Sequence, residues 1–265
     1  MATDLRFHSF GAICALMIPM GLKSGRTSSM NALGRLLLVF VAFLGLIGFS
    51  RVGVAQSADP SPLPLERDSV GEYLIARPSK ANGTLFVFYP GGKVPPRAYE
   101  HWARALAAQG VTVAIPVMPL DLAILGIYRA SAVRDALLAK GWRAKRFVVG
   151  GHSLGGAMAG WYASWLPVDG LVFMAAYPPW SIAEKTFPLL SIAAEFDGLA
   201  TLEKVRASLP NLPPSAQLEV IPGGVHAFFG RYGVQAGDGQ PTTPREVFES
   251  SVLEKLSVFL EKIRE

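Results

Sequence analysis

The sequence predicts an α/β fold, in which a mostly parallel central sheet carries helices on both faces. Two observations lead to this prediction. From residue 71 onward, apolar runs of strand length alternate with amphipathic segments of helix length. The apolar runs are continuous rather than alternately apolar and polar, which is typical of parallel strands buried on both faces. We therefore expect helices between successive strands, covering the two faces of one sheet.

The expected elements follow one another as strand and helix over a single domain, 71–265. The first strand ends at a Pro-Gly-Gly turn, and the first helix is stopped by Gly110. The last helix begins at Pro244, a residue favoured at helix starts. The expected strands are 84–89, 111–117, 146–150, 171–176, 189–194 and 217–221, and the expected helices are 99–109, 127–140, 156–165 and 244–263.

Residues 1–55 are predicted to be a leader, with the working start at Met30. Basic residues up to Arg35 precede fourteen uncharged, mostly apolar residues, and small residues follow. This order is typical of a secretory signal peptide. A helix of that length rises about 21 Å, short of the roughly 30 Å hydrocarbon core of a membrane, although an uncleaved anchor remains the alternative. We expect an exported or membrane-anchored protein, with 56–70 as a Pro-rich linker.

Charge and cysteine content exclude several classes of protein. The chain of 265 residues carries a net charge of +5, but 1–55 hold five basic and one acidic side chain, so the rest carries only +1. The basicity therefore gives no reason to expect a nucleic-acid partner. The only cysteine, Cys14, lies in the predicted leader, which leaves the body without disulfides or thiolate ligands. The histidines form no ligand cluster, so we expect no metal site.

The segment 151–155, Gly-His-Ser-Leu-Gly, matches the pattern G-x-S-x-G and lies between an expected strand and an expected helix. In that setting the serine occupies a sharp turn, and its hydroxyl is exposed above the sheet. The glycines are needed because side chains there would collide with the neighbouring strand and helix. Ser153 is therefore the predicted nucleophile.

A serine hydroxyl needs a base near neutral pH, and the chain offers four histidines. His8 lies in the leader, and His101 begins a helix far from the motif. His152 adjoins the serine, but neighbouring side chains on such a turn diverge, so we expect it to brace the turn. His226 remains, just after the last strand, at the edge of the sheet where ligands bind in open α/β folds.

The base needs a carboxylate that fixes its tautomer and stabilises the imidazolium. In the chain order serine, acid, histidine, that acid follows the strand 189–194. Asp197 is the predicted acid, because Asp-Gly makes a tight turn and the short side chain can reach the site. Glu195 is the alternative.

Two backbone N–H groups are expected to bind the oxygen that becomes negative in the transition state. One belongs to Leu154, the residue after the serine, and the other to Gly92 or Lys93 in the turn after the first strand. The segment between 176 and 189 holds only about a dozen residues, too few for a multi-helix cap. We therefore expect an open cleft without a large lid; its candidate substrate-binding side chains are Tyr177, Trp180 and Phe229.

These motifs together resemble the α/β-hydrolase superfamily, and more narrowly its small lidless bacterial members. The resemblance covers about 80–265 and includes the segments 88–92, 150–156, 194–198 and 223–239. It implies hydrolysis of esters or related acyl compounds without a cofactor, and it implies that the stretch 226–238 packs beside the site. Dienelactone hydrolases are similar too, but they have cysteine where Ser153 stands.

The predicted function is cleavage of carboxylic esters or thioesters through an acyl-enzyme on a Ser-Asp-His triad. The expected partner is a small-molecule acyl substrate, with a membrane contacted only through an uncleaved leader. Two alternatives remain open. One is an acyltransferase, lipase-like enzyme or peptidase on the same triad, and the other is a catalytically silent binding protein with this fold.

Overall fold

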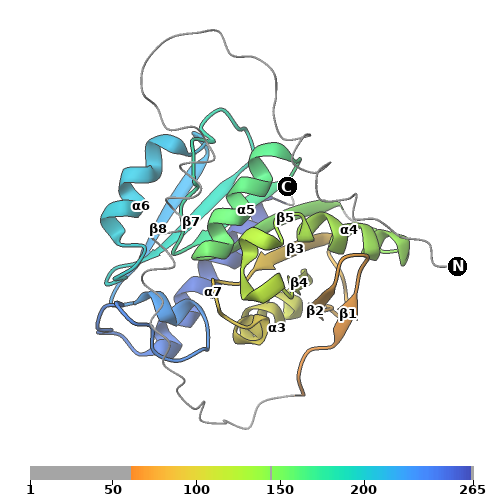
Figure 1. Ribbon diagram of the computed structural model, residues 1–265, viewed down its shortest axis with the longest axis horizontal. Coiled ribbons are helices and arrows are strands. Elements are labelled where there is room, and N and C mark those ends of the chain that lie inside the picture. Colours follow the sequence, from red (N-terminus) through yellow and green to blue (C-terminus); the bar gives the residue numbers. More distant parts are fainter. Residues whose placement is uncertain (1–60, 144, 264–265) are drawn as a thin grey trace, which may run out of the picture.

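The computed structural model describes residues 61–143 and 145–263 (Figure 1). The predicted leader and the first part of the predicted linker lie outside this range, so their expected roles stay predictions. Within the described part of the chain, no helix combines the length and the apolar character that crossing a membrane requires.

One sheet of eight strands forms the centre of the molecule, in the order β1-β2-β4-β3-β5-β6-β7-β8. The first two strands pair antiparallel, and β2 also pairs antiparallel with β4, whereas all pairs from β4 to β8 are parallel. This confirms the predicted, mostly parallel sheet. The strands are β1 (Leu65–Arg67), β2 (Glu72–Ala76), β3 (Thr84–Tyr89), β4 (Thr112–Pro116), β5 (Arg146–His152), β6 (Gly170–Met174), β7 (Leu189–Ala194) and β8 (Ala216–Ile221).

Two strands, β1 and β2, were not expected from the sequence. β1 has only three residues and lies within 56–70, the segment predicted to be a linker. The sheet therefore begins earlier than the predicted domain boundary at residue 71. β1 has too few residues for an apolar pattern that would distinguish it from a loop. Its pairing with β2 places it at the edge of the sheet.

Helices cover both faces of the sheet, as predicted (Figure 1). Along β3, Phe86 and Phe88 pack on the side of α3 and α7, whereas Leu85 and Val87 pack on the side of α4 and α5. The helices are α3 (Glu100–Ala108), α4 (Arg129–Ala139), α5 (Leu154–Trp165), α6 (Leu202–Ser208) and α7 (Arg245–Lys262); the 3-10 turns are η1 (Pro96–Tyr99), η2 (Pro119–Asp121), η3 (Ala123–Leu125), η4 (Leu209–Asn211) and η5 (His226–Phe229).

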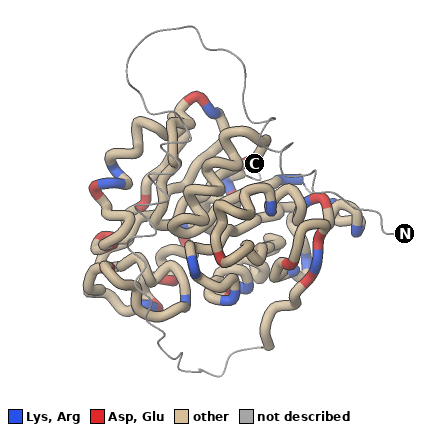
Figure 2. Tube along the Cα trace, in the orientation of Figure 1, with Lys and Arg blue, Asp and Glu red and all other residues tan. Residues whose placement is uncertain are grey.

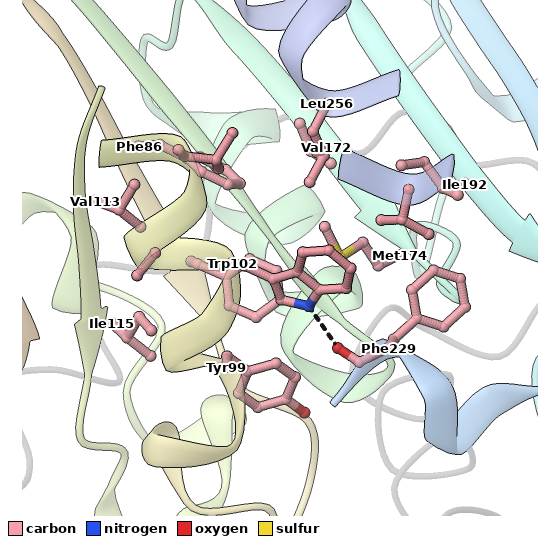
Figure 3. Packing of buried hydrophobic residues seen from close by; sticks show 14 of the residues in the cluster. Phe86, Tyr99, Trp102, Val113, Ile115, Val172, Met174, Ile192, Phe229 and Leu256 are labelled. Atoms are coloured by element: carbon pink, nitrogen blue, oxygen red, sulfur yellow. Dashed lines mark hydrogen bonds between the residues drawn. The ribbon is translucent and has the colours of Figure 1, made fainter. Parts of the chain in front are cut away.

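The core on the α3 and α7 side reaches the chain segment that carries η5. The buried Trp102 indole donates its N–H to the Phe229 carbonyl at 2.8 Å (Figure 3). Lys, Arg, Asp and Glu lie mainly on helices, edge strands and loops, and the central strands are nearly free of them (Figure 2). Burial of continuous apolar strands between two helical layers therefore holds the loops at the carboxyl ends of β3, β5, β7 and β8 in place.

The segment 175–188, between β6 and β7, contains no helix or strand. Its length and lack of secondary structure agree with the expected fold without a large lid.

Candidate active site

Ser153 lies on a sharp turn between the end of β5 and the start of α5. Its backbone has φ 55° and ψ −124°, a conformation that is costly for a residue with a side chain and is concentrated at functional sites. The Ser153 N–H donates to the Met174 carbonyl at 3.0 Å, and the Ser153 carbonyl accepts the Ala157 N–H at 3.1 Å. The strand and the helix on either side thus hold the serine in this strained geometry.

The glycines around Ser153 are required by close backbone contacts. A Cβ on Gly151 would lie 2.5 Å from the Tyr89 carbonyl oxygen, and one on Gly155 would lie 2.2 Å from the Pro90 carbonyl oxygen. Real Cβ atoms do not approach backbone oxygens so closely. The turn can therefore pack against the end of β3 only without side chains at these two positions.

His226 and Asp197 form a buried pair. His226 Nδ1 lies 2.8 Å from Asp197 Oδ2, and the two side chains are 2% and 0% exposed. The other carboxylate oxygen accepts the N–H groups of Leu199 and Ala200, each at 2.8 Å. When Nδ1 donates to the carboxylate, the neutral imidazole carries its lone pair on Nε2, the arrangement that a general base needs.

Glu195, the alternative acid, is used elsewhere. Its Oε2 accepts the Gly223 N–H at 2.9 Å, and the residue is exposed. The structure thus joins His226 to Asp197 and directs Glu195 to the backbone of the loop that precedes the histidine.

The His152 ring lies against the ring of His226. Its centroid is 4.4 Å from that of His226, and its Nδ1 lies 2.9 Å from the Tyr99 hydroxyl. This agrees with the expectation that His152 braces the turn. Among the hydrogen bonds of the described residues, none joins Ser153 Oγ to His226. Such bonds are often long in enzymes without substrate and tighten when substrate binds.

Gly92 and Leu154, two of the expected oxyanion donors, lie against each other. A Cβ on Gly92 would be 3.1 Å from Leu154 Cδ2, and the Leu154 N–H, at the first position of α5, has no partner within the helix. The Lys93 N–H donates to the Asp121 carbonyl at 2.8 Å. This corrects the prediction for Lys93, because its N–H is already used within the protein, and it leaves the Gly92 N–H as the remaining candidate donor in this turn.

A family model described as the alpha/beta hydrolase family matches residues 85–249, more than half of the chain. The chain belongs to the alpha/beta hydrolase family. The match includes the ends of β3, β5 and β7 and the η5 turn, which are the elements that carry the residues described above. No protein with a curated description matches this alpha/beta hydrolase in sequence.

Solved structures share its fold at low sequence identity. Unliganded esterase 2 of Thermogutta terrifontis is 14% identical, with a TM-score of 0.59 over 77% of this chain and 95% of that one. The same esterase phosphonylated by sarin is 12% identical, with a TM-score of 0.58 over 78% and 98%. A predicted CIB-like hydrolase from Thermoplasma acidophilum is 19% identical, with a TM-score of 0.54 over 74% and 98%.

Two of the three aromatic residues expected to line the cleft of this alpha/beta hydrolase are engaged in packing contacts instead. Phe229 is 0% exposed and packs edge-on against Phe248, with ring centroids 4.9 Å apart. Trp180 donates its N–H to Ser164 Oγ at 3.3 Å and packs near Trp161, on the distal half of α5. Both predictions are corrected, because an aromatic side chain near a site motif is drawn into the core when apolar surface is available there.

Tyr177, the third of these aromatic residues, remains beside the site. It is half-buried, and burial together with the negative charge of Asp197 raises the pKa of its hydroxyl. The neutral phenol therefore stays a candidate for contact with substrate.

Three residues that matter to this site were not singled out from the sequence. Tyr99 contacts His152 and Gly91, Asp238 accepts the His226 N–H at 3.0 Å, and Arg245 donates to carbonyls of the η5 turn. The resemblance did imply that 226–238 packs beside the site, and Asp238 ends that stretch.

Among the described residues, no three His, Cys, Asp or Glu side chains come together as a metal site would require.

Proposed function

We propose that this alpha/beta hydrolase cleaves carboxylic esters, or thioesters, through an acyl-enzyme formed on Ser153. The observation that carries the proposal is the buried pair of His226 and Asp197, at the same edge of the sheet as a serine in a strained strand-to-helix turn. The pair supplies an oriented base, and the turn supplies a nucleophile that stays 7% exposed. Together these are the parts that acyl transfer to a serine requires.

In the first step, Ser153 Oγ attacks the ester carbonyl while its proton passes to His226 Nε2. Asp197 stabilises the imidazolium that forms, and the carbonyl oxygen becomes negative beside the N–H groups of Leu154 and Gly92. The carbon–oxygen bond to the alcohol then breaks, and His226 returns the proton to the leaving oxygen. Water repeats the sequence on the acyl-enzyme and releases the carboxylic acid and the free serine.

The solved esterase supports this choice of substrate class. Structures of esterase 2 of Thermogutta terrifontis contain butyrate or propionate, and others are described as phosphorylated by paraoxon or phosphonylated by sarin. We propose by analogy that short acyl esters fit this chain, because 175–188 adds no helix that would enclose a longer acyl group.

The experiment is hydrolysis of p-nitrophenyl acetate, butyrate and octanoate, and of one acyl thioester, by the purified full-length chain. We expect turnover that falls by roughly 10⁶-fold in Ser153→Ala. Ser250→Ala is the matched control, because its exposed hydroxyl donates to the Glu246 carbonyl of α7. Folded protein without turnover on any of these substrates would contradict the proposal, and transfer to an added alcohol in preference to water would favour the acyltransferase alternative.

Export, or anchoring through residues 1–55, remains part of the proposal. It is supported by the basic and apolar pattern of that segment. Cell fractionation with N-terminal sequencing of the recovered protein tests it. Full-length protein confined to the cytosol would contradict it.

A further inference from the structure

The predicted base is the first residue of η5, a single 3-10 turn of four residues. So short a turn has few internal hydrogen bonds, and both of its ends present unpaired backbone groups. Its position must therefore be fixed by other parts of the chain. Two charged side chains, one at each end of the turn, do this.

At the N–H end, the Asp238 carboxylate contacts both the base and the acid segments. Oδ1 accepts the His226 N–H at 3.0 Å and the Gly198 N–H at 3.2 Å, and Oδ2 accepts the Ala227 N–H at 2.8 Å. Oδ1 also accepts the N–H of Gly239 at 2.8 Å. One carboxylate thus ties the turn of His226 to the residue that follows Asp197.

Backbone packing shows how closely these two segments fit. A Cβ on Gly198 would lie 2.1 Å from the Gly237 carbonyl oxygen, and one on Gly239 would lie 1.8 Å from the Phe196 carbonyl oxygen. Both glycines are therefore needed for the contact. The chain around Asp238 lies directly against the turn that carries Asp197, with no space for a side chain between them.

At the carbonyl end, the Arg245 guanidinium donates to the turn. Nη1 contacts the Gly230 carbonyl at 3.0 Å and the Ala227 and Phe228 carbonyls at 3.4 Å. The guanidinium carbon lies 4.4 Å from the centroid of the Phe228 ring, and Glu249 lies 3.8 Å from Nη1. Arg245 begins α7, so the turn is attached to the longest helix of the described chain.

We propose that Asp238 and Arg245 are positioning residues that hold η5 from both ends and thereby set the distance between His226 and Asp197. The carboxylate meets the N–H end and the guanidinium meets the carbonyl end, which is the charge order that a helical turn favours. This inference rests on the proposed function for its effect on catalysis. Its geometric part can be tested without any substrate.

The test variants are Asp238→Asn and Arg245→Lys. Each has a matched control beside the amino end of β5, which is the end of the strand away from Ser153. Asparagine keeps an acceptor at the Oδ1 position but turns an N–H group toward the Ala227 N–H, and lysine cannot reach three carbonyls. The controls are Asp169→Asn, whose carboxylate accepts the Phe147 N–H at 2.7 Å, and Arg146→Lys, whose Nε donates to the Ile263 carbonyl at 2.9 Å. Both controls change the same side-chain chemistry away from the site.

Steady-state kinetics and proton NMR are measured on the full-length protein. We expect kcat to fall by between about 10-fold and 10²-fold in both test variants, since displacing a catalytic group by about 1 Å has an effect of that size, while KM changes little. The low-field resonance of the proton between His226 and Asp197, identified by its loss in Asp197→Asn, should shift or broaden in the test variants. The controls should match the parent in kcat and in this resonance.

The outcomes separate the two proposals. Asp238→Asn and Arg245→Lys with parental kcat and an unchanged resonance would overturn the positioning role, whatever the substrate. A parent that hydrolyses no ester would contradict the proposed function, and the resonance would still decide the positioning role. If the low-field proton is absent from the folded parent, the positioning role fails as well, because the pair it serves is then not formed.

Discussion

The Tyr99 hydroxyl lies 2.9 Å from His152 Nδ1 and accepts the Gly91 N–H at 3.0 Å. Burial, with His226 close by, holds the pKa of His152 well below its usual range, so the ring is neutral and Nδ1 can accept a hydrogen bond from the Tyr99 hydroxyl. Burial also raises the pKa of Tyr99, which keeps its hydroxyl proton to donate. Tyr99 thus connects the turn that carries Gly92 to the residue before the predicted nucleophile.

Removing this hydroxyl should weaken both stability and turnover. In Tyr99→Phe the Gly91 N–H and His152 Nδ1 lose their partner, and buried groups left unpaired cost about 1–3 kcal/mol. We expect a lower free energy of unfolding in urea and a kcat reduced by roughly tenfold, since the Gly92 turn is no longer held. Tyr128→Phe, at an exposed position, is the control. Parental stability and kcat in Tyr99→Phe would show that this link is dispensable.

The two carboxylates that follow β7 should differ sharply in their effect on turnover. Asp197→Asn replaces the partner of His226 Nδ1 and favours the wrong tautomer, so kcat should fall by about 10⁴-fold. Glu195→Gln keeps an oxygen that can accept the Gly223 N–H and should leave kcat nearly unchanged. Ester hydrolysis by the two variants is the measurement. The opposite order would assign the acid to Glu195.

The chain's stability should depend on pH through His101. Burial, together with the charges of Arg231 and Arg245, lowers the pKa of His101 to about 3. Glu249, 3.6 Å from the His101 ring, is already paired with those arginines. Because the unfolded chain binds the proton more readily, this stability is complete above about pH 6.5 and is lost as the pH falls toward 3.

We expect His101 to account for a loss of about 2 kcal/mol between pH 7 and pH 5, at 1.36 kcal/mol per pKa unit. Urea unfolding at the two pH values, compared between the parent and His101→Phe, isolates this residue, since His152 titrates in both proteins. An equal loss in the parent and the variant would mean that the pKa of His101 is the same in the folded and the unfolded chain, which contradicts this prediction.

Gly155 should tolerate no side chain. Alanine there would place a Cβ 2.2 Å from backbone oxygens at the end of β3. Because the backbone cannot move aside without disturbing the sheet, we expect the free energy of unfolding to fall by about 3 kcal/mol. Turnover should be severely reduced as well. Gly141→Ala is the control, with φ 83° but no atom within 4 Å of the new Cβ, so only conformational strain of about 1 kcal/mol is expected. Thermal unfolding of both variants tests the difference, and equal losses would show that packing at the serine turn is adaptable.

Much of the fold could be predicted because its strands are continuous apolar runs. The bounds of β3 and β7 agree with the expected 84–89 and 189–194. Short elements were missed: β1 has three residues and α6 has seven, and neither shows a periodic pattern long enough to separate it from a loop. Contacts with the rest of the fold, rather than local sequence, determine the secondary structure of such short segments.

The candidate site likewise contains residues that could be predicted from the sequence and residues that could not. Ser153, Asp197 and His226 could be proposed because chain order relative to the strands constrains each of them. Asp238 and Arg245 act through backbone groups whose positions depend on the path of a loop, and no spacing rule gives that path. Their hydrogen bonds exist only once the loop packs against the turn of Asp197.

The central claim is that Ser153 is a nucleophile activated by His226, and covalent labelling tests it most directly. The purified full-length chain is treated with a fluorophosphonate, and the modified residue is located by mass spectrometry in the parent, Ser153→Ala and His226→Ala. We expect one adduct, on Ser153, that is absent from Ser153→Ala and forms far more slowly in His226→Ala. A folded parent that takes up no label, or an adduct that persists in Ser153→Ala, would contradict the claim.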